Sequence, residues 1–226
     1  MMLLVTGGSA SGKSAYAGKL AESLMVNKES CHREILYVAT LADRSPESKR
    51  RIERHKSLRD GGCYKVAECL SMEDLRNLSV SLSEAGRKDF SEYSSEQQYP
   101  VILFDSLDGF TADVFFKTDW TDVLSGQDIF DAARDLVWSL LSLEPSEGVL
   151  IVVSDNIYED GIRYDAVTCK YMEFTAAVEQ LLAEKADCAV EVICGIPILL
   201  KGENCEFLEI RRDHDISVHK DTGSSD

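Results

Sequence analysis

An eight-residue segment near the start of the sequence limits the possible folds of this chain more than any other feature. Residues 7–14 read GGSASGKS and match the pattern G-x-x-x-x-G-K-[ST] in full. An apolar run at 3–6 precedes them, and residues 14–25 follow with apolar side chains at helical spacing. In such a unit of strand, loop and helix, backbone amides and the positive end of the helix dipole converge on one anion. The segment therefore predicts a phosphate-binding loop (P-loop). A Gly/Ser-rich turn that matches by chance is the alternative, and the flanking strand and helix weigh against it.

The predicted loop gives each of its residue types a separate task. Glycines let the backbone turn its amides toward oxygen atoms, and Lys13 is predicted to reach the β- and γ-phosphates of a nucleotide. The hydroxyl of Ser14 is predicted to bind Mg²⁺. The residues expected to contact the nucleotide here are Gly7, Gly8, Ser9, Ala10, Ser11, Gly12, Lys13 and Ser14. The loop thus predicts GTP or ATP bound together with Mg²⁺.

Two aspartates follow strongly apolar runs and are candidates for a second metal-binding group. Asp105 comes after VILF, and Asp155 comes after LIVVS. A P-loop protein usually holds Mg²⁺ or its water with a carboxylate at the end of an apolar strand. Either aspartate could instead cap the helix that follows. We favour Asp105 as the residue that contacts the nucleotide and binds the metal together with Ser14.

Apolar runs alternate with helical patterns along the rest of the sequence. Strands are expected at 3–6, 34–40, 64–70, 101–107 and 149–155, and a last pair at 188–195 and 196–202. Helices are expected at 14–25, 46–58, 72–85, 109–117, 127–143 and 164–185. Strands that are apolar on both faces and alternate with helices favour a mostly parallel sheet flanked by helices on both faces. The expected fold class is α/β, P-loop NTPase-like, with an antiparallel pair of strands near the C-terminal end.

The pattern indicates one domain with a short extension. Residues 1–202 contain all the expected core elements and form the predicted nucleotide-binding domain. Residues 203–226 are charged and end in DTGSSD, so we expect a C-terminal extension that is partly disordered. Residues 86–100 are polar and Ser-rich and predict a loop.

Composition limits the kinds of binding partner and the cellular compartments that we expect for this chain. The net charge of −16 repels nucleic-acid backbones and anionic lipids, so we expect no nucleic-acid partner. No apolar run approaches the roughly 18 residues of a membrane span. No basic region precedes the first apolar run, and a cytoplasmic protein is expected. The seven cysteines lack metal-ligand spacing, and those in apolar runs (Cys69, Cys188 and Cys194) are expected to be reduced core thiols.

The most basic segment of this acidic chain is KRRIERHK, residues 49–56. A solvated helix face is one interpretation of it. The other is a triphosphate-binding surface, because six lysines and arginines between residues 49 and 59 would surround an anion of that size. His55 lies among these cations, which would lower the pKa of its imidazole and keep it neutral. A neutral imidazole that attacks an α-phosphate would give a phosphoramidate-linked nucleotide and release pyrophosphate.

Several segments, in order, resemble one known family. They are LLVTGGSASGKSAYA (3–17), ILYVAT (35–40), RIERHK (51–56) and KVAEC (65–69). Together they resemble the adenosylcobinamide kinase/adenosylcobinamide-phosphate guanylyltransferase family of cobalamin biosynthesis. The last pair of strands also fits, and the resemblance covers roughly residues 1–201.

The resemblance implies two activities. One phosphorylates adenosylcobinamide with ATP or GTP, and the other transfers GMP from GTP to adenosylcobinamide phosphate through a guanylylated histidine, giving adenosylcobinamide-GDP. The resemblance makes His55 that histidine and places the catalytic function on His55 and Lys13. Beyond the P-loop, the implied nucleotide contacts are Ala39, Thr40, Leu41, Lys56, Ser57, Leu58, Arg59 and Glu68. A buried carboxylate at Glu68 would accept hydrogen bonds from the N1–H and N2 groups of guanine. The family also implies a homotrimer.

The chain departs from the family pattern at positions near the expected site. Ser9 and Ala10 replace a small residue and an arginine, and Asp105 stands where the family usually has glutamate. Residues 154–164 replace a glycine-containing segment that borders the site, and 86–100 and the tail after 201 look like additions. Three alternatives stay open: a diverged member with guanylyl transfer alone, a P-loop kinase of another small metabolite, and a GTP-binding module without turnover.

Overall fold

The fold is an α/β sandwich in which one sheet separates two layers of helices. The computed structural model describes residues 1–26, 34–41, 49–50, 52–53, 64–85, 100–117, 126–158 and 161–202. The strands are β1 (Met2–Gly7), β2 (Ile35–Ala39), β3 (Tyr64–Glu68), β4 (Val101–Asp105), β5 (Val149–Asp155), β6 (Cys188–Ile193) and β7 (Ile196–Lys201). The helices are α1 (Lys13–Val26), α3 (Met72–Ala85), α4 (Leu107–Lys117), α5 (Gly126–Leu141) and α6 (Ala166–Lys185).

The seven-stranded sheet has the order β3-β2-β4-β5-β1-β6-β7. The five pairings from β3 across to β6 are parallel, and β6–β7 is antiparallel. The predicted fold class is confirmed, including the antiparallel pair of strands at the C-terminal end. β1 lies between β5 and β6, so the strand that leads into the P-loop is held by its neighbours on both edges.

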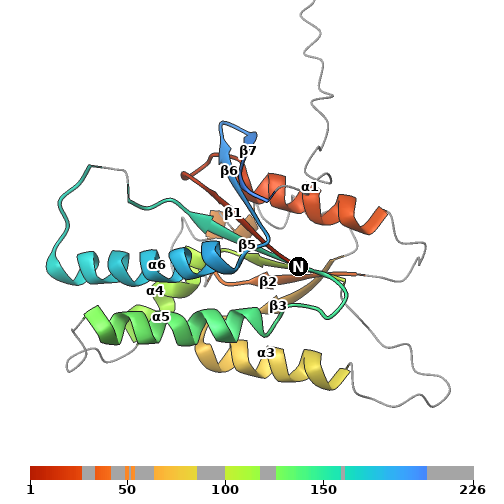
Figure 1. The fold of residues 1–226 in the computed structure, drawn as a ribbon, viewed down its shortest axis with the longest axis horizontal. Coiled ribbons are helices and arrows are strands. Elements are labelled where there is room, and N and C mark those ends of the chain that lie inside the picture. Colours follow the sequence, from red (N-terminus) through yellow and green to blue (C-terminus); the bar gives the residue numbers. More distant parts are fainter. Residues whose placement is uncertain are drawn as a thin grey trace, which may run out of the picture.

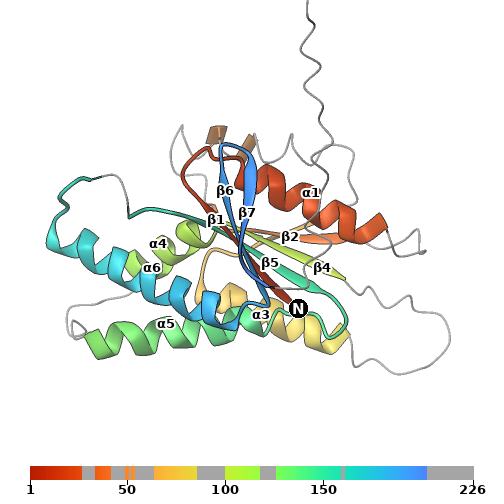
Figure 2. The same cartoon turned by 45° about the horizontal axis from the view of Figure 1, so that its top comes forward.

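Helices cover the two faces of the sheet unequally. In the described part of the chain, α1 lies on one face, and α3, α4, α5 and α6 lie on the other (Figures 1 and 2). Alternate residues of β1 divide between these faces: Leu3 and Val5 pack in the cluster that contains α1, whereas Met2 and Leu4 pack in the cluster that contains α3–α6. This alternation follows from the period of two in a β-strand.

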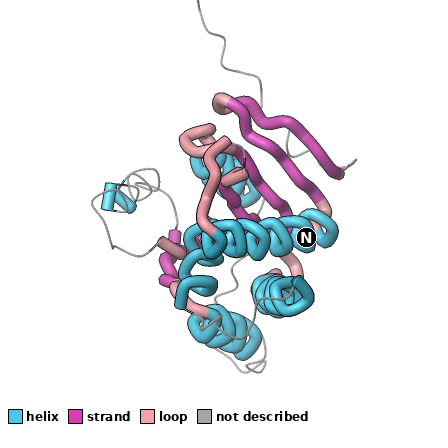
Figure 3. Tube along the Cα trace, turned by 90° about the vertical axis from the view of Figure 1, so that its left-hand side faces the viewer, coloured by secondary structure: helices cyan, strands magenta, loops and turns pink. Residues whose placement is uncertain are grey.

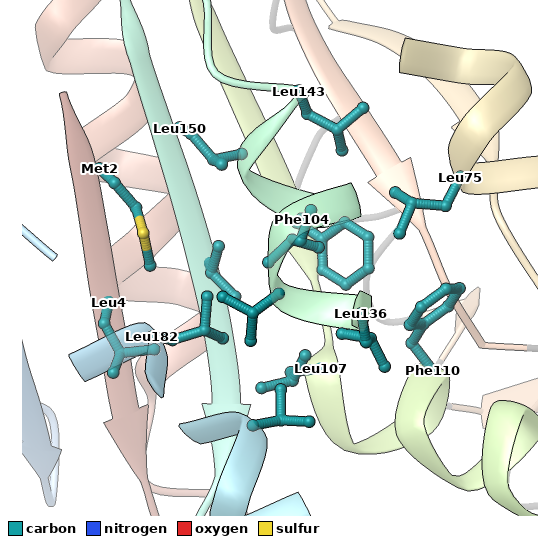
Figure 4. Packing of buried hydrophobic residues seen from close by; sticks show 14 of the residues in the cluster. Met2, Leu4, Leu75, Phe104, Leu107, Phe110, Leu136, Leu143, Leu150 and Leu182 are labelled. Atoms are coloured by element: carbon teal, nitrogen blue, oxygen red, sulfur yellow. The ribbon is translucent and has the colours of Figure 1, made fainter. Parts of the chain in front are cut away.

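The larger core lies between the sheet and helices α3–α6. Phe104 of β4 and Phe110 of α4 are fully buried there and meet edge to face, with ring centroids 5.4 Å apart. Leu136 and Leu182 reach the same core from α5 and α6 (Figure 4). Each fully buried side chain of this size contributes about 1.5–3 kcal/mol through the hydrophobic effect.

Local differences from the expected elements have identifiable causes. β4 ends at Asp105 rather than at 107, because α4 begins at Leu107 and only Ser106 lies between them. α6 begins at Ala166, because the Asp165 carboxylate accepts hydrogen bonds from the amides of Val167 and Thr168 and so caps the helix. Of the helix expected at 46–58, residues 49–50 and 52–53 are described, and all four are helical.

The cysteines differ in part from the expectation of reduced core thiols. Cys69 and Cys194 are free, and only Cys69 is buried. Cys194 lies in the exposed turn between β6 and β7. Cys188 is disulfide-bonded, so the expectation is wrong there, because sequence spacing does not report which sulfur atoms the fold brings together. None of the helices described is both long and apolar enough to cross a membrane.

Candidate functional site

The carboxyl ends of six parallel strands meet at one edge of the sheet, and five of these strands lead to predicted site residues. The register places Gly7 beside Asp155, and Ala39 beside both Asp105 and Glu68. In open α/β sheets, ligands bind at this edge. The P-loop, Asp105, Asp155, residues 39–41 and Glu68 were predicted from segments far apart in the sequence, and the fold brings them to the same edge.

The loop between β1 and α1 has the conformation that the glycines of the motif permit. Gly7 and Gly12 have φ angles of 155° and 97°. A Cβ on Gly7 would lie 2.5 Å from the carbonyl oxygen of Val192, so only glycine fits there. Inside the loop, the Ser11 amide donates to the Gly8 carbonyl oxygen over 3.1 Å. The loop thus has the tight backbone conformation that its glycines allow.

The tip of the β6–β7 hairpin supports the loop from the side. The Gly195 amide donates to the Ser11 carbonyl oxygen over 2.7 Å. A Cβ on Gly12 would lie 3.3 Å from the Cα of Gly195, so the two backbones are in close approach. Figure 3 shows the tip of the hairpin beside the loop between β1 and α1. No local sequence pattern indicates that the turn between the last two strands contacts the P-loop.

Lys13 lies inside the loop, next to an acidic partner. Its side chain is buried, its ammonium forms an ion pair with the carboxylate of Asp155, and it also donates to the Gly8 carbonyl oxygen over 3.3 Å. Asp155 ends β5, the strand adjacent to β1. Asp155 was the less favoured of the two aspartates for the metal, and it lies against the lysine of the loop.

Ser14 and Asp105 meet at the start of α1. The Ser14 hydroxyl donates to Oδ1 of Asp105 over 3.2 Å, and the Tyr37 hydroxyl donates to Oδ2 over 3.0 Å. Asp105 is only 4% exposed, so Tyr37 and Ser14 fix its position. The pairing of Ser14 with Asp105 was predicted from the sequence. The contact of Tyr37 with Asp105 was not, because Tyr37 lies in the middle of an apolar strand.

This pair of oxygen ligands fits Mg²⁺ bound together with a nucleotide. Mg²⁺ commonly takes one or two protein ligands and completes its shell with phosphate oxygens and water. The described residues contain no group of three or more His, Cys, Asp and Glu side chains placed to hold a metal alone. Ser14 and Asp105 could supply two of its oxygen ligands, and phosphate oxygens and water would supply the others.

Thr40 is buried and bonded to the protein rather than directed outward. Its hydroxyl donates to the carbonyl oxygen of Ser106 over 2.6 Å and accepts from the Ser106 amide over 2.7 Å. These two bonds fix the backbone next to Asp105. Ala39 and Leu41, the neighbours of Thr40, are partly exposed at the carboxyl edge.

Glu68 has a different environment from the one expected. It lies at the end of β3, the edge strand of the sheet, and its side chain is exposed rather than buried. Because an edge strand has a neighbour on one side only, the rest of β3 is also poorly covered, and Val66 is 54% exposed. The expectation of a buried carboxylate is therefore wrong in this structure.

The remaining predicted site residues lie outside the described residues. They are His55, Lys56, Ser57, Leu58 and Arg59. Their roles stay predictions.

A second acidic network adjoins Asp155 and was missed by sequence analysis. Glu179 of α6 accepts hydrogen bonds from the hydroxyls of Ser154 and Tyr158, the latter over 2.6 Å. Burial raises the pKa of Glu179, the charge of Asp155 raises it further, and the two hydroxyl donors lower it. No motif reports this contact, because 25 residues separate Glu179 from Ser154 in the chain.

A comparison with known families identifies the chain. The family model of cobinamide kinase/cobinamide phosphate guanyltransferase, named CobU, matches residues 3–200. The chain belongs to the CobU family. Membership makes this CobU protein an enzyme of the transferase class, with nucleotide and cobinamide substrates, in cobalamin biosynthesis. No match was found among the curated proteins. The match includes every predicted site residue of the CobU protein and ends just before the C-terminal extension.

Proposed function

We propose that this CobU family protein is a bifunctional enzyme. It phosphorylates adenosylcobinamide with ATP or GTP, and it transfers GMP from GTP to adenosylcobinamide phosphate, giving adenosylcobinamide-GDP. One observation supports the proposal most: the formed P-loop places Lys13 against Asp155 and Ser14 against Asp105, at the carboxyl edge of the sheet of a CobU chain.

In the kinase step, the side chains at the loop bind and orient the triphosphate. The ammonium of Lys13 contacts the β- and γ-phosphates, either in place of Asp155 or together with it. The loop amides bind the remaining phosphate oxygens. Bound Mg²⁺ would neutralise charge on the β- and γ-phosphates, held by Ser14 and Asp105. The acceptor hydroxyl of adenosylcobinamide then bonds to the γ-phosphorus, its proton leaves, and the nucleoside diphosphate departs.

In the guanylyl step, His55 is the proposed nucleophile. Its neutral imidazole bonds to the α-phosphorus of GTP, and the bond to pyrophosphate breaks. The phosphate of adenosylcobinamide phosphate next bonds to the same phosphorus, the bond to His55 breaks, and adenosylcobinamide-GDP is released. The basic residues around His55 would neutralise charge that develops on the triphosphate. The same proposal includes the homotrimer of the family.

The test is labelling of the full chain with GTP that carries radioactive phosphorus at the α or the γ position, with Mg²⁺. We expect α-label to stay on the denatured protein, to be lost in acid but not in alkali, and to be absent from His55→Ala. His32→Ala, which alters a histidine outside the basic segment, is the control and should label like the wild type. If neither label is retained although GTP binds, covalent guanylylation is rejected.

A diverged member that has guanylyl transfer alone is the second candidate. The segment after β5 favours it, since Tyr158 there hydrogen-bonds Glu179 over 2.6 Å, whereas the family pattern has glycines in this region. Transfer of γ-label to adenosylcobinamide by the wild type would reject this candidate. Guanylylation without such transfer would support it.

A further inference from the structure

Glu179 contacts the chain on both sides of Asp155. Its Oε1 accepts from the Ser154 hydroxyl, and its Oε2 accepts from the Tyr158 hydroxyl over 2.6 Å. Ser154 directly precedes Asp155, and Tyr158 follows three residues later. One carboxylate on α6 thereby contacts both the end of β5, where Asp155 lies, and the residues that follow it.

Asp155 in turn is bound to the P-loop through side chain and backbone. Its carboxylate forms the ion pair with Lys13, and its backbone lies beside Gly7 in the β1–β5 register. The next amide, from Asn156, donates to the Gly7 carbonyl oxygen over 2.9 Å. A continuous set of contacts therefore leads from Glu179 to the lysine that the phosphates would meet.

The two hydrogen bonds of Glu179 compensate for its surroundings. Glu179 is partly buried and lies near a second carboxylate, Asp155, and both conditions disfavour its charged form. A buried charge is costly unless hydrogen bonds compensate for it. Each oxygen of Glu179 accepts from one hydroxyl, and both hydroxyls belong to the segment that contains Asp155.

We propose that Glu179 is a positioning residue of the phosphate site: through Ser154 and Tyr158 it orients Asp155, which holds Lys13 inside the P-loop before the nucleotide binds. The inference rests on the nucleotide-binding part of the proposed function. It does not depend on His55 or on which corrinoid is the acceptor. A lysine already placed in the loop loses less conformational freedom when the phosphates arrive, so the network favours binding.

The test is a double-mutant cycle on the full chain, with affinity for Mg²⁺–GTP measured by calorimetry. Glu179→Ala should weaken binding roughly threefold to tenfold, the range expected for one net hydrogen bond. Glu179→Gln keeps one acceptor oxygen, so its affinity for Mg²⁺–GTP should fall less than that of Glu179→Ala. Asp155→Asn should weaken binding, and Glu179→Ala should add no further loss in that background, because the effect passes through Asp155.

Matched control variants distinguish the loss of a positioning contact at the phosphate site from a general loss of folded structure. Glu173→Gln, on the same helix and with a side chain 54% exposed, should bind GTP like the wild type. If Glu179→Ala fails to fold, Tyr158→Phe removes one donor and should show the same dependence on Asp155. Thermal melting of each variant shows whether it is folded.

Two results would overturn the inference while the wild type binds GTP. The first is unchanged affinity in Glu179→Ala and Tyr158→Phe. The second is a pair of losses that multiply in the double variant, which would mean that Glu179 acts independently of Asp155. A wild type that binds no Mg²⁺–GTP would reject the proposed function itself, and this inference with it.

Discussion

At the scale of single residues, the site depends on two carboxylates and their partners: Asp155 with Lys13, and Asp105 with Ser14. Lys13→Ala removes the ammonium that faces Asp155 and that would meet the phosphates. A hydrogen bond to a charged group contributes about 1.5–3 kcal/mol, so GTP affinity should fall about tenfold to a hundredfold. Calorimetric titration of the variant and the wild type with Mg²⁺–GTP measures this loss of affinity.

The control for Lys13 lies on the same helix. Lys19 is exposed on α1, and Lys19→Ala should leave affinity within twofold. Equal losses in the two variants would indicate a nonspecific charge effect rather than a phosphate contact by Lys13.

Thr40 gives a second residue-scale prediction, about stability rather than binding. Thr40→Val keeps the shape of the side chain but leaves the amide and carbonyl of Ser106 without the hydroxyl that bonds both. A buried polar group that loses its partner costs about 1–3 kcal/mol. Urea unfolding of Thr40→Val should show a loss of that size, whereas Thr40→Ser should lose much less. A loss in Thr40→Ser as large as in Thr40→Val would assign the effect to the missing methyl group.

At the scale of elements, helix α5 tests the larger core. Leu136 is 1% exposed and packs between α5 and the rest of this core, so Leu136→Ala should cost about 2–5 kcal/mol in the free energy of unfolding. Arg134→Ala alters the exposed side of the same helix and should change stability by less than about 0.5 kcal/mol. Chemical denaturation of both variants makes the comparison, and similar midpoints would contradict the packing described.

The β6–β7 turn offers a second element-scale test. Gly195 has a φ of 80°, which side chains with a Cβ rarely adopt. Gly195→Ala should cost about 1 kcal/mol, and Gly195→Asn should cost less because Asn tolerates this conformation better. Because the Gly195 amide bonds the Ser11 carbonyl oxygen, GTP affinity should fall with stability in this series. Unchanged GTP affinity in Gly195→Ala would mean that the turn does not support the loop.

Sequence patterns predicted the elements better than their contacts. Runs such as VILF and LIVVS are apolar on both faces, so the parallel sheet follows from them directly, and the P-loop follows from its glycines. The Tyr37–Asp105 bond joins residues 68 apart in the chain, and no local pattern reports such a pair. Glu68 was misjudged because exposure depends on which strand forms the sheet edge, and that order is a property of the whole fold.

At the scale of the whole molecule, a buried cysteine reports on global opening, and an exposed cysteine serves as its control. Cys69 is fully buried, and burial, with a contribution from Asp74, raises the pKa of its thiol to about 12. Cys169 is exposed and free. Because the thiolate is the reactive form, iodoacetamide at pH 8 should modify Cys169 promptly and Cys69 only when the protein unfolds.

A bound nucleotide should then protect Cys69 selectively. Binding to the folded state alone stabilises it by about 2.7 kcal/mol at a ligand concentration 100 times Kd. Mg²⁺–GTP at that level should slow modification of Cys69 about a hundredfold and leave Cys169 unchanged, as peptide mass spectrometry would measure. Rapid modification of Cys69 in the free protein would show that its region opens locally.

The place of β1 in the sheet has a consequence for synthesis. Leu3 pairs with Ile151 on one side and with Cys188 on the other, and the P-loop that follows it is supported by Gly195. β1 therefore leaves the ribosome long before the two strands that pair with it. Pairings that distant in sequence form slowly, and an apolar strand exposed meanwhile is prone to aggregation. Nascent chains released before residue 149 should retain no GTP, and chaperones should bind them at β1, which then lacks both of its neighbouring strands.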